Sequence, residues 1–325
     1  MKRIAALFLA LFIIATAFVA CTQPNTDNND NNDNNNNENN NENNTPTENE
    51  YALSIGVVVT ENLATLKLTE TVATIVTDKD GKIVLCRIDC VDYSAKYDED
   101  GALITTAPTS KVTLGDAYSG MPAGSWATQG SAFEQFVIGK TQAEVTALVN
   151  ESGYAADAEL IASCSINIGD IAKAVDNAFK STAKVTFKTT ATTFTAGLNY
   201  KGAVADSSTD ESKNVKFTAT YAATVLVEGK VVATILDCAE ASLVNVGDEG
   251  AESVSYAGTK REQGDSYAMT SGAWYVQADA YAKSAEGKTA TDIATLATEG
   301  VAGCTMPYST YDFKAAIETA VASAR

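Results

Sequence analysis

The most informative stretch of this sequence is DGKIVLCRIDC, residues 80–90, because it returns as EGKVVATILDC at residues 228–238. An acidic residue and a glycine between two apolar, β-branched segments are typical of a β-hairpin turn. Each occurrence therefore predicts two antiparallel strands joined by a short turn. We expect these strands at 71–77, 82–91, 217–227 and 230–239.

Other parts of the chain repeat at the same spacing. KVTLGDAY at 111–118 matches KREQGDSY at 260–267, and the spacing of Trp126 and Gln129 matches that of Trp274 and Gln277. The offset is 148 or 149 residues throughout, which is far too long for a solenoid repeat. We therefore expect two copies of one domain, each with its own core. The copies span residues 51–183 and 184–325, and the first has an insertion around 152–159.

Both copies predict the same order of elements. Thr141 and Thr289 each precede a carboxylate by three residues, which favours a capped helix start. Further strands are expected at 52–60, 63–68, 184–194 and 195–203. Helices are expected at 131–138, 141–149, 275–284 and 289–297, with a closing amphipathic helix after each set. Strands followed by helices predict an α+β fold of two tandem homologous domains, each an antiparallel sheet followed by helices.

The first 50 residues predict export. Two basic residues, an uncharged apolar stretch and small residues before Cys21 form a signal peptide over residues 1–20. Its cleavage site resembles that of bacterial lipoproteins, which implies that Cys21 carries a lipid and that this lipid anchors the protein to a membrane. The alternative is that the segment stays uncleaved and is itself the membrane anchor. Residues 21–50, rich in Asn and acids, predict a disordered linker. Both alternatives place the rest of the chain at the outer face of the cytoplasmic membrane or at the cell surface.

The composition excludes several kinds of site. The chain has no histidine, so it cannot form a Ser-His-Asp triad or a His-ligated zinc site by itself. Its net charge of −18 argues against nucleic acid as a partner. The sequence contains no Cys-x-x-Cys motif, so it does not predict a metal site formed by cysteines. An enzyme is therefore less expected than a binding protein, although Asp89 and Asp237 are candidates for acid–base chemistry.

The hairpin, followed later by a Gly-Cys-Thr step into an amphipathic helix, resembles the bacterial FMN-binding domain of exported flavoproteins. In that family a threonine can carry FMN through a phosphoester bond. The resemblance implies Thr305 as the attachment site, with Ser165 at the equivalent position. Only Gly303 and Thr305 match the motif outright, since alanine stands at 302 and cysteine at 304. Helix capping is the alternative role of both hydroxyls.

The repeated cysteines and the repeated aromatic residues each have two possible roles. Export permits disulfides, and the simplest pairing is Cys90–Cys164 and Cys238–Cys304; otherwise these are buried thiols, and Cys86 has no equivalent. Tyr118, Trp126, Tyr267 and Trp274 could stack on a flat ligand such as an isoalloxazine or a sugar, or pack in the core.

Together these features predict a membrane-anchored extracytoplasmic lipoprotein that acts as a flavin-binding or electron-carrying module. The alternative is a non-enzymatic lipoprotein that binds a glycan, peptide or small molecule, or that has a structural role. A hydrolase based on carboxylates ranks third.

Overall fold

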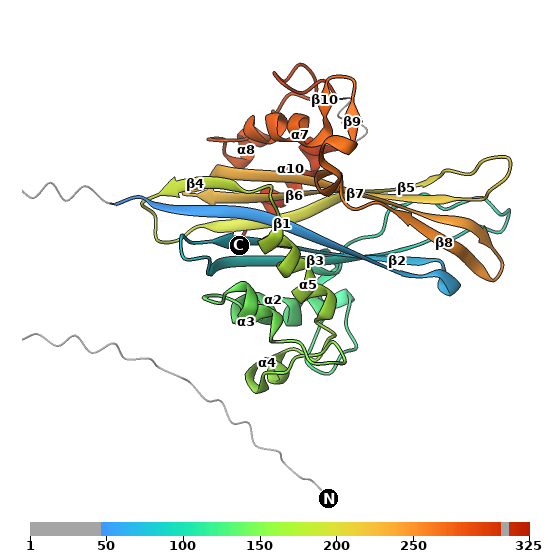
Figure 1. Cartoon of the computed structure of the whole chain (residues 1–325), viewed down its shortest axis with the longest axis horizontal. Helices are drawn as coiled ribbons and strands as arrows, with labels where there is room; N and C mark the ends of the chain where they lie inside the picture. The colour runs from blue at the N-terminus through green and yellow to red at the C-terminus, as the bar shows by residue number, and fades with distance from the viewer. Residues whose placement is uncertain (1–46, 307–311) are drawn as a thin grey trace, which may run out of the picture. The chain divides into compact units, whose positions relative to one another are not determined.

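The computed structural model describes residues 47–306 and 312–325 (Figure 1). The expected signal peptide, Cys21 and most of the linker lie outside these residues. These described residues form one compact unit. Its two larger sheets are antiparallel and each has four strands, so the expected α+β class is confirmed.

The first sheet has the strand order β3-β2-β1-β4. Its strands are β1 (Asn49–Asn62), β2 (Lys67–Thr77), β3 (Ile83–Ser94) and β4 (Val185–Thr189). The Asp-Gly hairpin joins β2 to β3 as predicted, with Gly81 at φ 73°. The predicted strand at 63–68 is wrong, because Leu63–Thr65 form a 3₁₀ turn (η1) and Leu66 has a left-handed backbone conformation.

The second sheet has the order β5-β6-β7-β8. Its strands are β5 (Thr195–Asp206), β6 (Val215–Val227), β7 (Lys230–Gly247) and β8 (Gly250–Tyr256). β5 to β7 repeat β1 to β3, with the predicted turn at Glu228 and Gly229. β4, which was expected in the second copy, instead pairs with β1 of the first. Along the sequence, the last strand of the first sheet therefore comes immediately before the first strand of the second sheet.

Helices cover one face of each sheet. The first copy has α1 (Lys111–Leu114), α2 (Trp126–Phe136), α3 (Gln142–Thr146), α4 (Ala158–Ser163) and α5 (Gly169–Lys180). The second copy has α6 (Lys260–Gln263), α7 (Trp274–Lys283), α8 (Ala290–Ile293) and α10 (Phe313–Ala322), with the short strands β9 (Ala268–Met269) and β10 (Gly272–Ala273). Short 3₁₀ turns, η2 (Gly115–Ala117) and η3 (Gly264–Ser266), follow α1 and α6. The predicted capped helix starts are present at Thr141 and Thr289, where each threonine forms a capping box with the carboxylate three residues later.

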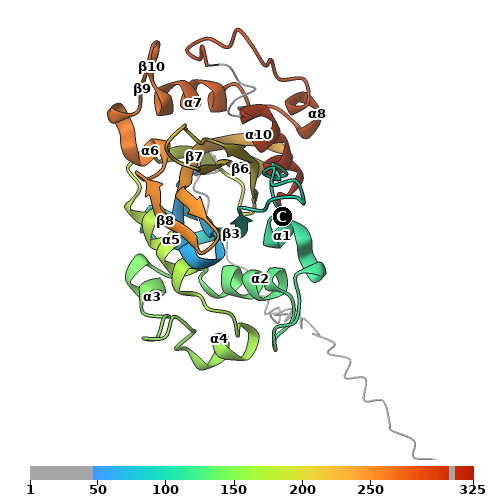
Figure 2. The ribbon, with the colours of Figure 1, turned by 90° about the vertical axis from the view of Figure 1, so that its right-hand side faces the viewer.

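The elements stack in four layers, helices–sheet–sheet–helices (Figures 1 and 2). α2 and α5 pack on the first sheet, and α7 and α10 pack on the second. Each copy has a core between its sheet and its helices, and a third core lies between the two sheets. This third core contains Leu53 and Leu68 from the first copy and Phe217 and Leu243 from the second. The copies are thus joined face to face through their sheets.

Candidate functional site

The repeated aromatic residues surround a lysine of the chain itself. The Lys111 Nζ lies 5.0 Å from the ring centre of Tyr118 and 5.9 Å from that of Trp126. It also pairs with Asp92 at 3.3 Å. In the second copy, the Lys260 ammonium lies 4.7 Å from Tyr267, 5.8 Å from Trp274 and 3.1 Å from a carboxylate oxygen of Glu240.

This arrangement is built like a small core. Trp126 and Trp274 are 5% and 0% exposed. Burial acts to raise the pKa of Asp92 and Glu240, but the adjacent lysines outweigh it and hold both pKa values below the usual range. The two aromatic pairs belong to separate helical cores, so the four residues do not meet in one pocket. These positions match the core-packing alternative, with cation–π contacts in place of a stacked ligand.

The two hydroxyl candidates, Ser165 and Thr305, are held in the same way. The Oε1 of Gln129 accepts hydrogen bonds from the backbone N of Ser165 at 2.6 Å and from its hydroxyl at 3.0 Å. Gln277 accepts the same pair from Thr305, at 3.0 and 3.1 Å. Neither residue is the N-cap of the closing helix of its copy, because Ile168 and Asp312 occupy the N-cap positions of α5 and α10. Thr305 is exposed, whereas Ser165 is half-buried.

The repeated cysteines lie in the two helical cores. Of the two alternatives, disulfides or buried thiols, the structure has the second: Cys86, Cys90, Cys164 and Cys238 are free thiols, and Cys304 is buried beside α7 and α10. Burial raises the pKa of each of these four thiols, to about 12 for Cys238. A thiol that resists ionisation is a poor nucleophile, so these residues pack rather than react.

The two candidate acids, Asp89 and Asp237, occupy equivalent buried positions. Asp89 Oδ1 accepts from the backbone N of Cys90 at 2.7 Å and of Val112 at 3.1 Å. Asp237 Oδ1 accepts from Cys238 at 2.7 Å and from Arg261 at 3.3 Å. Each carboxyl thus ties its β-sheet to the short helix α1 or α6. Burial raises both pKa values to about 6 despite these hydrogen bonds.

A groove that the sequence did not indicate lies beside Asp237. It consists of three adjoining hollows between the connector 181–184, which links α5 to β4, and the helices α6 and α7. Arg261 lines all three, and their volumes are about 220, 410 and 200 Å³. We call this the connector groove. Asp237 lies at the wall of the first hollow.

The largest hollow of the connector groove presents both charges and a ring. Lys184 and Arg261 lie on its wall with Asp265, Asp279 and Tyr275. Arg261 is fixed there, because its Nε donates to the Leu236 carbonyl and its Nη2 pairs with Asp279. The Tyr275 hydroxyl donates to Asp265 over 3.2 Å. Such a wall can receive a cationic and an anionic group together.

The sequence feature that could have indicated this groove is a set of residues that differ between equivalent positions of the two copies. Arg261, Tyr275 and Asp279 stand where the first copy has Val112, Ala127 and Ser131. The repeated residues therefore mark what the fold needs, and these three mark what only the second copy has.

No family model, curated protein or solved structure matches the chain. Within residues 47–306 and 312–325, no helix is long and apolar enough to cross a membrane. The same residues contain no cluster of His, Cys, Asp or Glu suited to a metal ion.

Proposed function

We propose that this protein is the binding module of an extracytoplasmic lipoprotein, and that the connector groove holds a small polar ligand with both charges, such as an amino acid or short peptide. The export signal and Cys21 support the location. The observation that carries the binding proposal is the wall of the largest hollow, where Lys184 and Arg261 lie with Asp265 and Asp279.

The size and chemistry of the hollow agree with this ligand class. Its volume, about 410 Å³, lies within the 300–1,000 Å³ that is usual for small-molecule sites. A ligand carboxylate would meet Lys184 and Arg261, and its ammonium group would meet Asp265. The fixed Arg261 guanidinium lowers the ordering cost of binding, because its position is already set by Leu236 and Asp279.

Calorimetric titration with free amino acids and dipeptides, dialanine among them, tests the proposal. Binding should be lost when dialanine is acetylated and amidated, since both charges then disappear. Asp265→Asn should weaken binding about tenfold or more, because a charged hydrogen bond contributes about 1.5–3 kcal/mol. Asp116→Asn is the matched control, as it changes the equivalent exposed residue of the first copy. Absence of binding across the panel, or equal affinity in Asp265→Asn, would contradict the proposal.

A flavin carried on Thr305 is the second candidate. The observation in its favour is that Thr305 is exposed and held by Gln277 at the place where the resemblance implies attachment. Protein made together with a flavin transferase should be yellow and gain the mass of FMN, and Thr305→Ala should abolish the gain. A colourless product of unmodified mass would remove this candidate. The test is independent of the connector groove.

A further inference from the structure

One carboxyl group is buried in the core between the two sheets. Glu70 lies on β2, on the same face as Leu68 and Val72, and its side chain is 0% exposed. Its Oε2 accepts a hydrogen bond from the hydroxyl of Tyr221, on β6 of the other copy. Its Oε1 has no hydrogen-bond partner among the described residues. The hydrogen bond to Tyr221 therefore crosses from one copy to the other.

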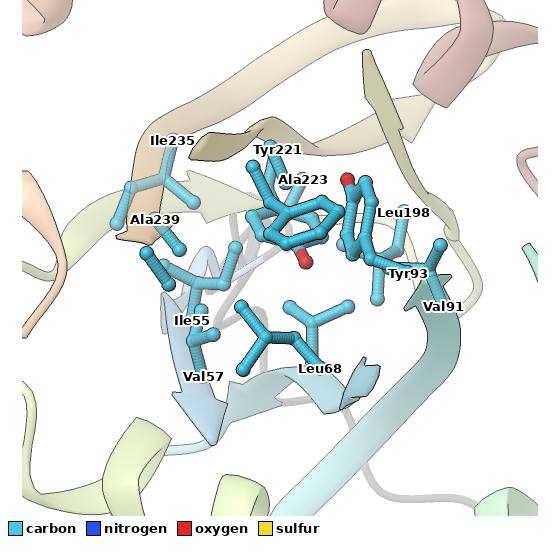
Figure 3. Packing of buried hydrophobic residues seen from close by; sticks show 14 of the residues in the cluster. Ile55, Val57, Leu68, Val91, Tyr93, Leu198, Tyr221, Ala223, Ile235 and Ala239 are labelled. Atoms are coloured by element: carbon cyan, nitrogen blue, oxygen red, sulfur yellow. The ribbon is translucent and has the colours of Figure 1, made fainter. Parts of the chain in front are cut away.

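Among residues 47–306 and 312–325, hydroxyl groups surround Glu70 and no cation pairs with it. Tyr93 on β3, Tyr200 on β5, Tyr221 on β6 and Tyr256 on β8 all interact electrostatically with this carboxyl. Figure 3 shows Tyr93 and Tyr221 reaching into the layer between the sheets, near Leu68. No lysine or arginine of the described segments forms an ion pair with Glu70.

Two of these tyrosines also interact with other titratable groups. Tyr200 also interacts with Asp89, and Tyr256 interacts with Asp237, Cys238 and Glu262. These groups are carboxyls and a thiol, so none of them supplies a positive charge that could offset one on Glu70. A carboxylate placed here would lack both water and a counterion, and such a charge is expensive to bury.

The second copy shows that the fold itself does not need an acid here. Ala219 stands at the position equivalent to Glu70, and it is fully buried. Glu70 is therefore a special feature of the first copy, placed where the two copies meet.

We propose that Glu70 is a proton-operated latch between the two sheets. With its proton, the carboxyl stays in the core and bonds to Tyr221; without it, the charge favours separation of the two sheets. The idea goes beyond the connector groove and does not rest on it. Burial raises the pKa of Glu70 to about 7, against the opposing effect of the Tyr221 hydrogen bond, so the latch would operate near neutral pH.

The sign of the effect follows from linkage. The pKa is 4.5 in the unfolded chain and about 7 in the folded protein, so the folded state holds its proton more tightly. The stabilisation is complete below pH 4.5 and is lost as the pH rises to about 7. For this group alone, the folding equilibrium constant should fall about 70-fold between pH 5 and pH 8.

Urea unfolding between pH 5 and pH 8 tests the latch. The folding constant of Glu70→Gln divided by that of wild type should rise about 70-fold across this range. The contributions of Asp89 and Asp237 to the pH dependence cancel in this ratio, because both proteins contain these residues. Glu61→Gln, an exposed acid on β1, should keep the wild-type profile. A ratio that stays constant within about threefold would overturn the proposal.

Infrared spectroscopy of the folded protein gives a second measurement. The difference spectrum between wild type and Glu70→Gln should contain a protonated carboxyl band that titrates near neutral pH, because the buried Asp89 and Asp237 contribute equally to both proteins. If that variant does not fold, Tyr221→Phe keeps the acid but removes its hydrogen bond, and the band should then titrate at a higher pH. A midpoint unmoved in Tyr221→Phe, or a protonated band at pH 6 that is equal in wild type and Glu70→Gln, would overturn the latch.

Discussion

Replacing the buried ion pair of the first copy with the apolar pair of the second should have a strongly non-additive effect. Arg87 Nη1 lies 3.5 Å from Glu134 Oε2, and the two side chains are 8% and 1% exposed. The second copy has Ile235 and Ala282 at the equivalent positions, both buried. The substitutions Arg87→Ile and Glu134→Ala therefore place in the first copy a pair that the fold already accommodates.

The single changes should be costly because each leaves a charge behind. In Glu134→Ala, the Arg87 guanidinium stays buried without its carboxylate, and the backbone N of Ile88 loses an acceptor at 2.9 Å. Breaking a buried pair in this way costs about 3–5 kcal/mol. Arg87→Ile should cost less, about 2 kcal/mol, because Arg325 still bonds to both oxygens of Glu134 at 2.7 and 2.8 Å.

The double variant should recover much of this loss, since no buried charge remains. We expect a coupling free energy of at least about 2 kcal/mol from urea unfolding followed by circular dichroism. The exposed pair Lys79–Asp80, 2.8 Å apart, is the control, and its cycle should show no measurable coupling. Equal coupling in the two cycles, or wild-type stability of Glu134→Ala, would refute this reasoning.

Three further predictions concern the helices, the hydroxyl clamp and the buried acids. Gly56→Ala should cost at least about 2 kcal/mol in thermal unfolding, because its Cβ would overlap the backbone of α5 at Ala174; a normal melting temperature would count against this packing. Gln277→Leu should leave the fold intact but remove hydrogen-exchange protection from the backbone N of Thr305, and unchanged protection would show that the clamp is not needed. Burial raises the pKa of Asp237 to about 6, so wild type should lose about 2 kcal/mol of stability from this group as the pH rises from 3.8 to 6, and Asp237→Asn should remove this loss; parallel stability curves would contradict it.

The internal repeat made much of the fold predictable from sequence. The two hairpins and the capped helix starts at Thr141 and Thr289 are local features, and they formed where expected. The pairing of β4 was not predictable in this way, because the alternation around Phe187 indicates a strand but not the sheet that receives it. The hairpin of β7 and β8 was also missed beyond residue 239.

The candidate site was less accessible to sequence reasoning. Repetition drew attention to Tyr118, Trp126 and their equivalents, yet these residues recur because both copies need the same core. The connector groove depends on residues that differ between the copies, such as Arg261. Glu70 resembles an ordinary surface acid, and its burial becomes evident only when the second sheet covers β2.

The central claim is that the two copies form one structural unit joined by the core between their sheets. Each copy has one tryptophan, Trp126 or Trp274, within its own helical core. Urea unfolding of Trp274→Phe and Trp126→Phe therefore reports on the first and the second copy separately. In each variant, the fluorescence transition should coincide with the transition seen by circular dichroism. A fluorescence midpoint clearly separated from the circular dichroism midpoint would show that the copies unfold independently, and would contradict the claim.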